Sequence, residues 1–225
     1  MSAENRLYFS NIFNVDKKVI SEYGAFNISL INDLPLFIDP FLLFNSEKEE
    51  YQVLHNEIIQ YLIFLKEKVN QYKNVTKPML NTWFLFPEVK QMWLGFCEKG
   101  NSGRGLGMDF ALALSDALGK IFDDFGKEKV TSGSHLEKVC LIKDRVGKDN
   151  ISDFTANLIR HYLLSYTQTF AQEFLAKDVC KIFCIDKVKF NYSTESWVSA
   201  SYYLPCFFDD YVLLTPMDIL RREDT

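Results

Sequence analysis

The sequence predicts a mixed α/β (α+β) fold: a helix-rich single domain with small sheet elements from the N-terminal and C-terminal segments. Two long stretches predict the helices. In residues 46–73 and again in residues 155–176, apolar side chains recur every three or four residues. A third observation predicts the sheet. Roughly the last 50 residues are enriched in Val, Ile, Phe and Tyr, which is typical of strands.

Composition narrows the class of protein. The 225 residues are 48% hydrophobic and 15% aromatic, which is enough for one buried core spanning residues 1–225, with a weak sub-boundary near 123–135. A net charge of −5 excludes global attraction to nucleic acid, so such binding needs a local basic patch. Five cysteines at irregular spacing indicate reduced thiols and a cytoplasmic protein. We expect no membrane partner, since no apolar stretch approaches the roughly 20 residues that span a bilayer.

The first half of the sequence predicts short strands followed by helices. Residues 6–13 and 25–31 read as short strands, and residues 36–41 form an apolar run broken by Pro40. Ser46 followed by Glu49 forms a capping box that starts the first long helix. Pro87 favours the first position of a second helix.

The second half predicts a deeply buried helix, then strands. The helix covers residues 155–176, and the strands cover 179–188, 197–203 and 211–214. Thr215 and Pro216 then indicate the start of a new helix. A helix of barely two turns is marginal alone, so we expect this end to dock on a partner or to continue in a longer protein.

Residues 136–154 predict a divalent-metal site at a strand-to-helix junction. Glu137, Asp149 and Asp153 supply the oxygen ligands that Mg²⁺ prefers, and Lys143 and Lys148 would stabilise an anionic transition state. Restriction-type nucleases use this chemistry. Their acid-x-lysine strand is missing after the cluster.

A structural alternative explains the same block. Ser152 or Asp153 would cap the following helix, and Asp149 with Asn150 would form a turn. Replacing Asp149 and Asp153 by Ala separates the two readings, because only a metal site would lose Mg²⁺-dependent cleavage.

A glycine-rich loop before a helix is a second candidate site. Gly103, Arg104, Gly105 and Gly107 would bind phosphate through backbone N–H groups and the guanidinium. The loop matches neither a P-loop nor a dinucleotide fingerprint. A flexible linker between helices is the alternative.

Histidines and cysteines give no further motif. Cys180 and Cys184 lack a second ligand pair, so a structural zinc site is not expected. Arg160 and His161 are adjacent on the buried helix, and Tyr162 and Leu163 indicate that this face is core.

The aromatic residues near the C-terminus would either anchor a protein partner or homo-oligomer, or fill the core.

Two runs, residues 147–159 and 210–220, resemble segments of uncharacterised bacterial proteins, some of them carried in mobile or phage-defence loci. They cover about a tenth of the chain. The resemblance implies an antiviral, nucleic-acid-directed role and assigns no residue.

Two functional hypotheses follow. The first is a nucleic-acid-directed effector of bacterial antiviral defence, acting as a metal-dependent nuclease. The second is a non-catalytic interaction module of a larger defence protein or complex, which size measurement and co-purification would reveal.

Overall fold

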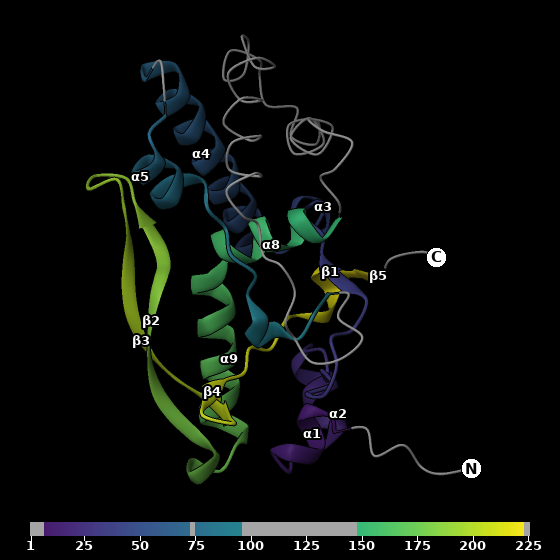
Figure 1. Ribbon diagram of the computed structural model, residues 1–225. Helices are drawn as coiled ribbons and strands as arrows, with labels where there is room; N and C mark the ends of the chain where they lie inside the picture. The colour runs from purple at the N-terminus through teal and green to yellow at the C-terminus, as the bar shows by residue number, and fades with distance from the viewer. Residues whose placement is uncertain (1–6, 73–74, 96–147, 223–225) are drawn as a thin grey trace.

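A computed structural model describes residues 7–72, 75–95 and 148–222, and it confirms the mixed α+β class (Figure 1). The helices and helical turns of the described residues are α1 (Phe9–Ile12), α2 (Lys17–Tyr23), α3 (Pro40–Phe44), α4 (Glu49–Gln71), α5 (Lys77–Met79), a π-helical turn (Leu80–Phe84), a 3₁₀ turn (Lys90–Met92), α8 (Lys148–Leu158), α9 (Arg160–Phe174), and 3₁₀ turns Lys177–Val179 and Met217–Ile219. The strands are β1 (Leu36–Ile38), β2 (Cys180–Asn191), β3 (Ser196–Phe207), β4 (Asp210–Tyr211) and β5 (Leu220–Arg222).

The spine of the fold is α8 followed by α9, along which the β2–β3 hairpin lies (Figure 1). One helix was predicted over 155–176. The helical segment begins earlier, at Lys148, and divides at Ile159, whose ψ of 14° interrupts the regular geometry. Leu163 and Phe170 are fully buried, as the apolar pattern predicted.

The C-terminal strands form one long hairpin. Cys180 pairs with Pro205 at one end and Asn191 with Ser196 at the other, and the register shifts between Ile185 and Lys189. The third predicted strand is shorter than expected, because only Asp210 and Tyr211 pair with β3. Residues 212–214 instead donate backbone hydrogen bonds to Pro205, Gln91 and Thr167.

The helix predicted from Thr215 is wrong. A single 3₁₀ turn, Met217–Ile219, leads directly into β5, which pairs antiparallel with β1. The pairing links Ile38 with Leu220 and Leu36 with Arg222. Strand pairing with a segment more than 180 residues earlier, as between Ile38 and Leu220, is invisible in local sequence and overrides the capping signal.

The strands predicted at residues 6–13 and 25–31 are also wrong. Residues 9–12 and 17–23 are helical, with the Asp16 carboxylate capping α2 and Gly24 ending it in the left-handed region at φ 84°. Only isolated bridges, Tyr8 with Ser29 and Ala25 with Pro216, remain of the expected sheet.

The long helix α4 is confirmed, and its predicted capping box is not. The helix starts at Glu49 with Lys48 as N-cap, and the Ser46 hydroxyl accepts from the Lys48 N–H outside the helix. The predicted stripe is buried at Leu54, Ile58, Leu62 and Leu65, where it faces the main core.

The helix predicted from Pro87 is absent over the described residues 87–95. Of these residues, Lys90–Met92 form a 3₁₀ turn, and Trp93 and Gly95 have positive φ (52° and 138°). The Pro87 carbonyl accepts a hydrogen bond from the Asn157 side chain (2.7 Å). The helical turns lie earlier, at α5 and Leu80–Phe84.

Candidate functional site

Most of the site residues predicted from sequence lie outside the described part of the structure. These are Glu137 and Lys143, the loop Gly103, Arg104, Gly105 and Gly107, and the sub-boundary at 123–135. The structure describes Lys148 and Asp149 only as backbone in α8.

The structural alternative for the same block is wrong in detail. Asp149 and Asn150 are helical and form no turn, and Ser152 and Asp153 lie inside α8 rather than at its N-terminus. The Ser152 hydroxyl accepts from the Ile38 N–H (2.9 Å) and so ties α8 to β1. The Asp153 carbonyl accepts from the Asn157 side chain (2.8 Å). Within the described ranges, no group of three or more His, Cys, Asp or Glu residues is arranged to hold a metal ion.

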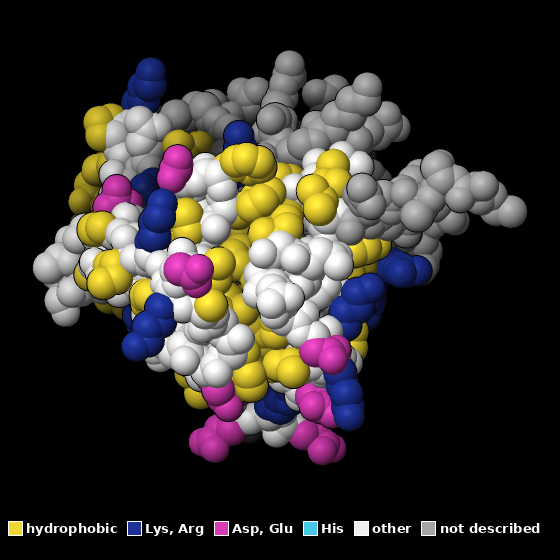
Figure 2. Space-filling view, turned by 90° about the horizontal axis from the view of Figure 1, so that it is seen from below, with side chains coloured by type: hydrophobic (Ala, Val, Ile, Leu, Met, Phe, Trp, Pro, Cys, Tyr) yellow, Lys and Arg dark blue, Asp and Glu magenta, His cyan; other side chains and the backbone are white. Residues whose placement is uncertain are grey.

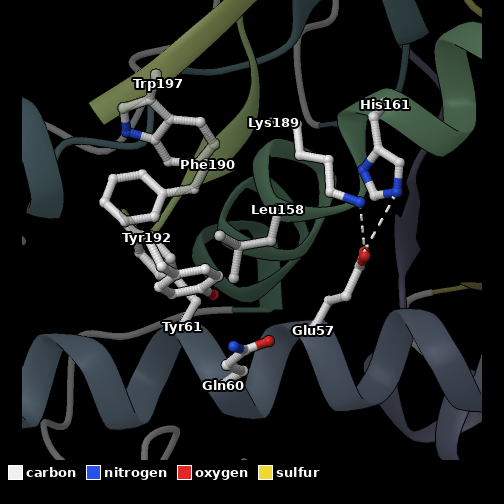
Figure 3. A pocket seen from close by; sticks show the side chains of 9 residues that line it. All are labelled: Glu57, Gln60, Tyr61, Leu158, His161, Lys189, Phe190, Tyr192 and Trp197. Atoms are coloured by element: carbon white, nitrogen blue, oxygen red, sulfur yellow. Dashed lines mark hydrogen bonds and ion pairs between the residues drawn. The ribbon is translucent and has the colours of Figure 1, made fainter. Parts of the chain in front are cut away.

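A pocket of about 250 Å³ lies where α4, the junction of α8 and α9, and the hairpin meet (Figure 3). Nine side chains line it: Glu57, Gln60, Tyr61, Leu158, His161, Lys189, Phe190, Tyr192 and Trp197. Figure 3 shows the aromatic rings of Tyr61, Phe190, Tyr192 and Trp197 at one end and Glu57, His161 and Lys189 at the other, with Leu158 and Gln60 between them. A small apolar pocket with a few convergent polar groups is typical of a small-ligand site.

The aromatic end is held rigidly by edge-to-face contacts. The Phe190 ring centroid lies 4.9 Å from that of Tyr61, 5.3 Å from that of Trp197 and 5.2 Å from that of Tyr192. Such pairs have favourable quadrupole geometry.

The polar tips of two of these rings are bound to backbone. The Tyr61 hydroxyl donates to the Trp83 carbonyl (2.8 Å), and the Trp197 indole N–H donates to the Thr82 carbonyl (2.8 Å). Neither polar group therefore needs a ligand partner. The rings offer the pocket an apolar wall.

The polar end is built around the Glu57 carboxylate. Oε1 lies 2.9 Å from the Lys189 Nζ, and Oε2 lies 3.2 Å from the His161 Nε2. The Glu57 and His161 side chains are 27% and 22% exposed, so both are shielded yet reachable from the pocket. Because a carboxylate only accepts, a hydrogen bond between these two atoms requires the proton of His161 to be on Nε2.

The charges of the trio balance at neutral pH. Burial lowers the pKa of His161 below its ordinary value, and Lys189 lowers this pKa further, while Glu57 opposes the shift. The imidazole is therefore mostly uncharged near pH 7, which leaves one carboxylate and one ammonium. A neutral pocket with exposed hydrogen-bonding groups suits a neutral planar ligand.

Sequence reasoning missed this site. His161 was assigned to the core from its neighbours, and Glu57 carries no motif in the middle of α4. Glu57 and Lys189 are 132 residues apart, and only the packing of the hairpin on α4 brings them together. The one local signal is helical spacing on α4, since Glu57 and Tyr61 share a helix face.

The comparisons with known proteins identify a family whose function is not described. A family model described as a domain of unknown function, DUF8370, matches residues 14–225. The chain belongs to this family. All nine pocket residues fall within the span that DUF8370 matches. Neither the curated proteins nor the solved structures gave a significant match. Among the described residues, no helix combines the length and the hydropathy that crossing a bilayer requires.

Proposed function

We propose that this protein is a nucleic-acid-directed effector whose pocket receives one unpaired nucleobase. The supporting observation is the pairing, in a single pocket, of a rigid aromatic wall with the Glu57, His161 and Lys189 trio. Aromatic side chains stack bases in a sequence-tolerant way, and polar side chains at the far end can read the base edge.

The size and charge of the pocket favour a single base. Its volume of about 250 Å³ is below the roughly 300–1,000 Å³ typical of drug-sized ligands, so one or two fused rings are accommodated. Of the trio, Lys189 is the most exposed at 58%, which places a cation at the rim where a phosphate would pass. This is a local basic element on a chain of net charge −5.

Two lysines of β2 provide a matched test. Lys189 pairs with Glu57 at 2.9 Å and Lys181 pairs with Asp209 at 3.0 Å, and the two side chains are 58% and 56% exposed. Only Lys189 lines the pocket. Lys189→Ala should weaken base binding about tenfold, since it removes a charged hydrogen bond, and Lys181→Ala should leave binding unchanged.

The measurement is a thermal shift with nucleosides and short single-stranded DNA and RNA. A bound ligand at about 100 times its Kd should add roughly 2.7 kcal/mol to the free energy of unfolding. Absence of any shift with every base-containing probe would contradict the proposal. Equal losses in the two lysine variants would contradict the pocket as the site.

The metal-dependent nuclease remains part of the proposal, along with a role in antiviral defence in the bacterial cytoplasm. Positions 149 and 153 are four residues apart in α8, the spacing at which two positions share a helix face. The Asp149→Ala, Asp153→Ala double variant tests it. Loss of Mg²⁺-dependent cleavage with an unchanged fold would support a metal site that includes Glu137, with Lys143 and Lys148 assisting catalysis.

A second candidate function is an interaction module, favoured by the turn between β3 and β4. Phe208 is 89% exposed in that turn, and both Phe208 and Asp209 have positive φ (46° and 63°). Figure 2, which views the end of the molecule near α1, α2 and β4, shows apolar side chains running across the centre of that face. Other aromatic residues of this region are less available, since Tyr211 is buried.

Strain at an exposed aromatic residue is typical of a functional position. A partner protein or second copy would bury Phe208. Phe208→Ser should therefore reduce oligomer size or co-purification if this function is correct.

A further inference from the structure

The trio presents an ordered row of hydrogen-bonding groups. Lys189 Nζ contacts Oε1 of Glu57 at 2.9 Å, and His161 Nε2 contacts Oε2 at 3.2 Å. Each carboxylate oxygen has two acceptor positions, so each keeps one after its partner is bound. The ammonium has three donors and uses one on Glu57. From the Lys189 side the row therefore reads donor, acceptor, acceptor.

The pairing edges of the four bases differ in this pattern. Guanine presents an acceptor and two adjacent donors (O6, N1–H and the N2 amino group). Adenine presents a donor and an acceptor, cytosine a donor and two acceptors, and uracil an acceptor, a donor and an acceptor. Only the guanine edge complements the whole row.

We propose that the pocket selects guanine and that Glu57 is the specificity-determining residue. In this arrangement N1–H and the N2 amino group donate to the two Glu57 oxygens, and Lys189 donates to O6. The inference rests on the proposed function, because it names the base that the same pocket receives.

Glu57 is already oriented for this role before a ligand enters. His161 and Lys189 hold its two oxygens from separate elements, α9 and β2, so the carboxylate loses little rotamer freedom on binding. The aromatic wall fixes the plane of the base at the opposite end of the pocket (Figure 3). His161 is a positioning residue here, since its Nε2 proton is used on Glu57.

Discrimination between the bases follows from the free-energy cost of leaving hydrogen-bonding groups of the pocket unpaired. A base without two adjacent donors leaves a Glu57 oxygen facing an acceptor or an apolar edge, and sites of this kind reject such analogues strongly. Hydrophobic contact alone would bind purines with little distinction.

The test compares guanosine, inosine and adenosine by titration calorimetry on the full chain. Inosine lacks only the 2-amino group of guanosine. Wild-type protein should bind guanosine at least about tenfold more tightly than inosine, and should bind adenosine more weakly than inosine. Equal affinity for the three nucleosides would overturn guanine selection and leave base binding intact. Absence of binding to any nucleoside would overturn both.

The matched variant is Glu57→Gln, which keeps the size of the side chain and turns one acceptor into a donor. The preference for guanosine over inosine should disappear in this variant, whereas Lys181→Gln should keep it. Retention of the preference in Glu57→Gln would overturn the role of Glu57. If that variant does not fold, the nucleoside ratios measured on wild-type protein still decide guanine selection.

Discussion

At the scale of single residues, the site depends on Glu57, whose role is invisible in the sequence. Glu57 lies on α4 among buried Leu54, Ile58 and Tyr61, and no role was predicted for it from the sequence. His161 was assigned to the core from its neighbours, and it is partly buried. That assignment missed the pocket, because a ligand site set inside a core uses the same burial pattern.

Asp33 is a second buried acid outside the pocket, and it predicts a pH dependence. Burial raises its pKa from 3.8 to about 7, the nearby Glu88 raises this pKa further, and Lys90 opposes the shift. Neither carboxyl oxygen has a hydrogen-bond partner among the described residues.

Asp33→Asn should therefore stabilise the protein at high pH. Between about pH 4 and pH 7, Asp33 binds a proton in the folded state and not in the unfolded state. The contribution of Asp33 to the free energy of unfolding is therefore complete below pH 4 and is lost as pH rises through about 7. Relative to wild type, the free energy of unfolding of the variant should rise by about 1–4 kcal/mol from pH 4 to pH 8. Urea denaturation at both pH values measures it. Asp209→Asn, at a side chain 94% exposed, is the control, and an identical response in the two variants would contradict the assignment.

At the scale of elements, the periodicity of apolar residues predicted the helices and strands that pack against the core. It did not predict the elements that depend on pairing between distant strands. The stripe on α4, the helix around Leu163 and the strands of the hairpin all follow from apolar spacing. The β1–β5 pairing depends on contacts between distant segments. The signals at Pro87 and Thr215 were local preferences that such contacts overrode, whereas the Ser46 hydroxyl accepts from the nearby Lys48 N–H and does not cap the helix.

Thr167 joins α9 to the extended segment after β4, and its removal should be costly. Its hydroxyl is fully buried, donates to the Leu163 carbonyl (2.8 Å) and accepts from the Leu214 N–H (2.9 Å). Thr167→Val leaves that N–H unpaired and should destabilise the protein by about 1–3 kcal/mol.

The matched control lies two residues further along α9. Thr169 is exposed, and its hydroxyl donates to the Ser165 carbonyl (3.0 Å) in its own helix. Thr169→Val should change the free energy of unfolding by less than about 0.5 kcal/mol in the same urea titration. Equal effects at the two positions would show that the link to Leu214 contributes nothing.

At the scale of the whole molecule, the pocket is the meeting point of three parts of the fold. α4 supplies Glu57, Gln60 and Tyr61, the helical spine supplies Leu158 and His161, and the hairpin supplies the remaining wall. The sequence predicted each of these parts, since all three are long and strongly patterned. It could not predict their contact, because no local pattern fixes which face of the hairpin packs against which turn of α4.

The most direct test of a base in this pocket is the indole N–H spectrum of the protein during titration with guanosine. Trp197 lines the pocket, whereas Trp93 contacts Phe207 elsewhere in the fold, so the two tryptophans report on different places in one NMR experiment. We predict that the Trp197 signal shifts saturably with guanosine and that the Trp93 signal stays in place. An unchanged Trp197 signal, or an equal shift of both signals, would contradict the proposed site.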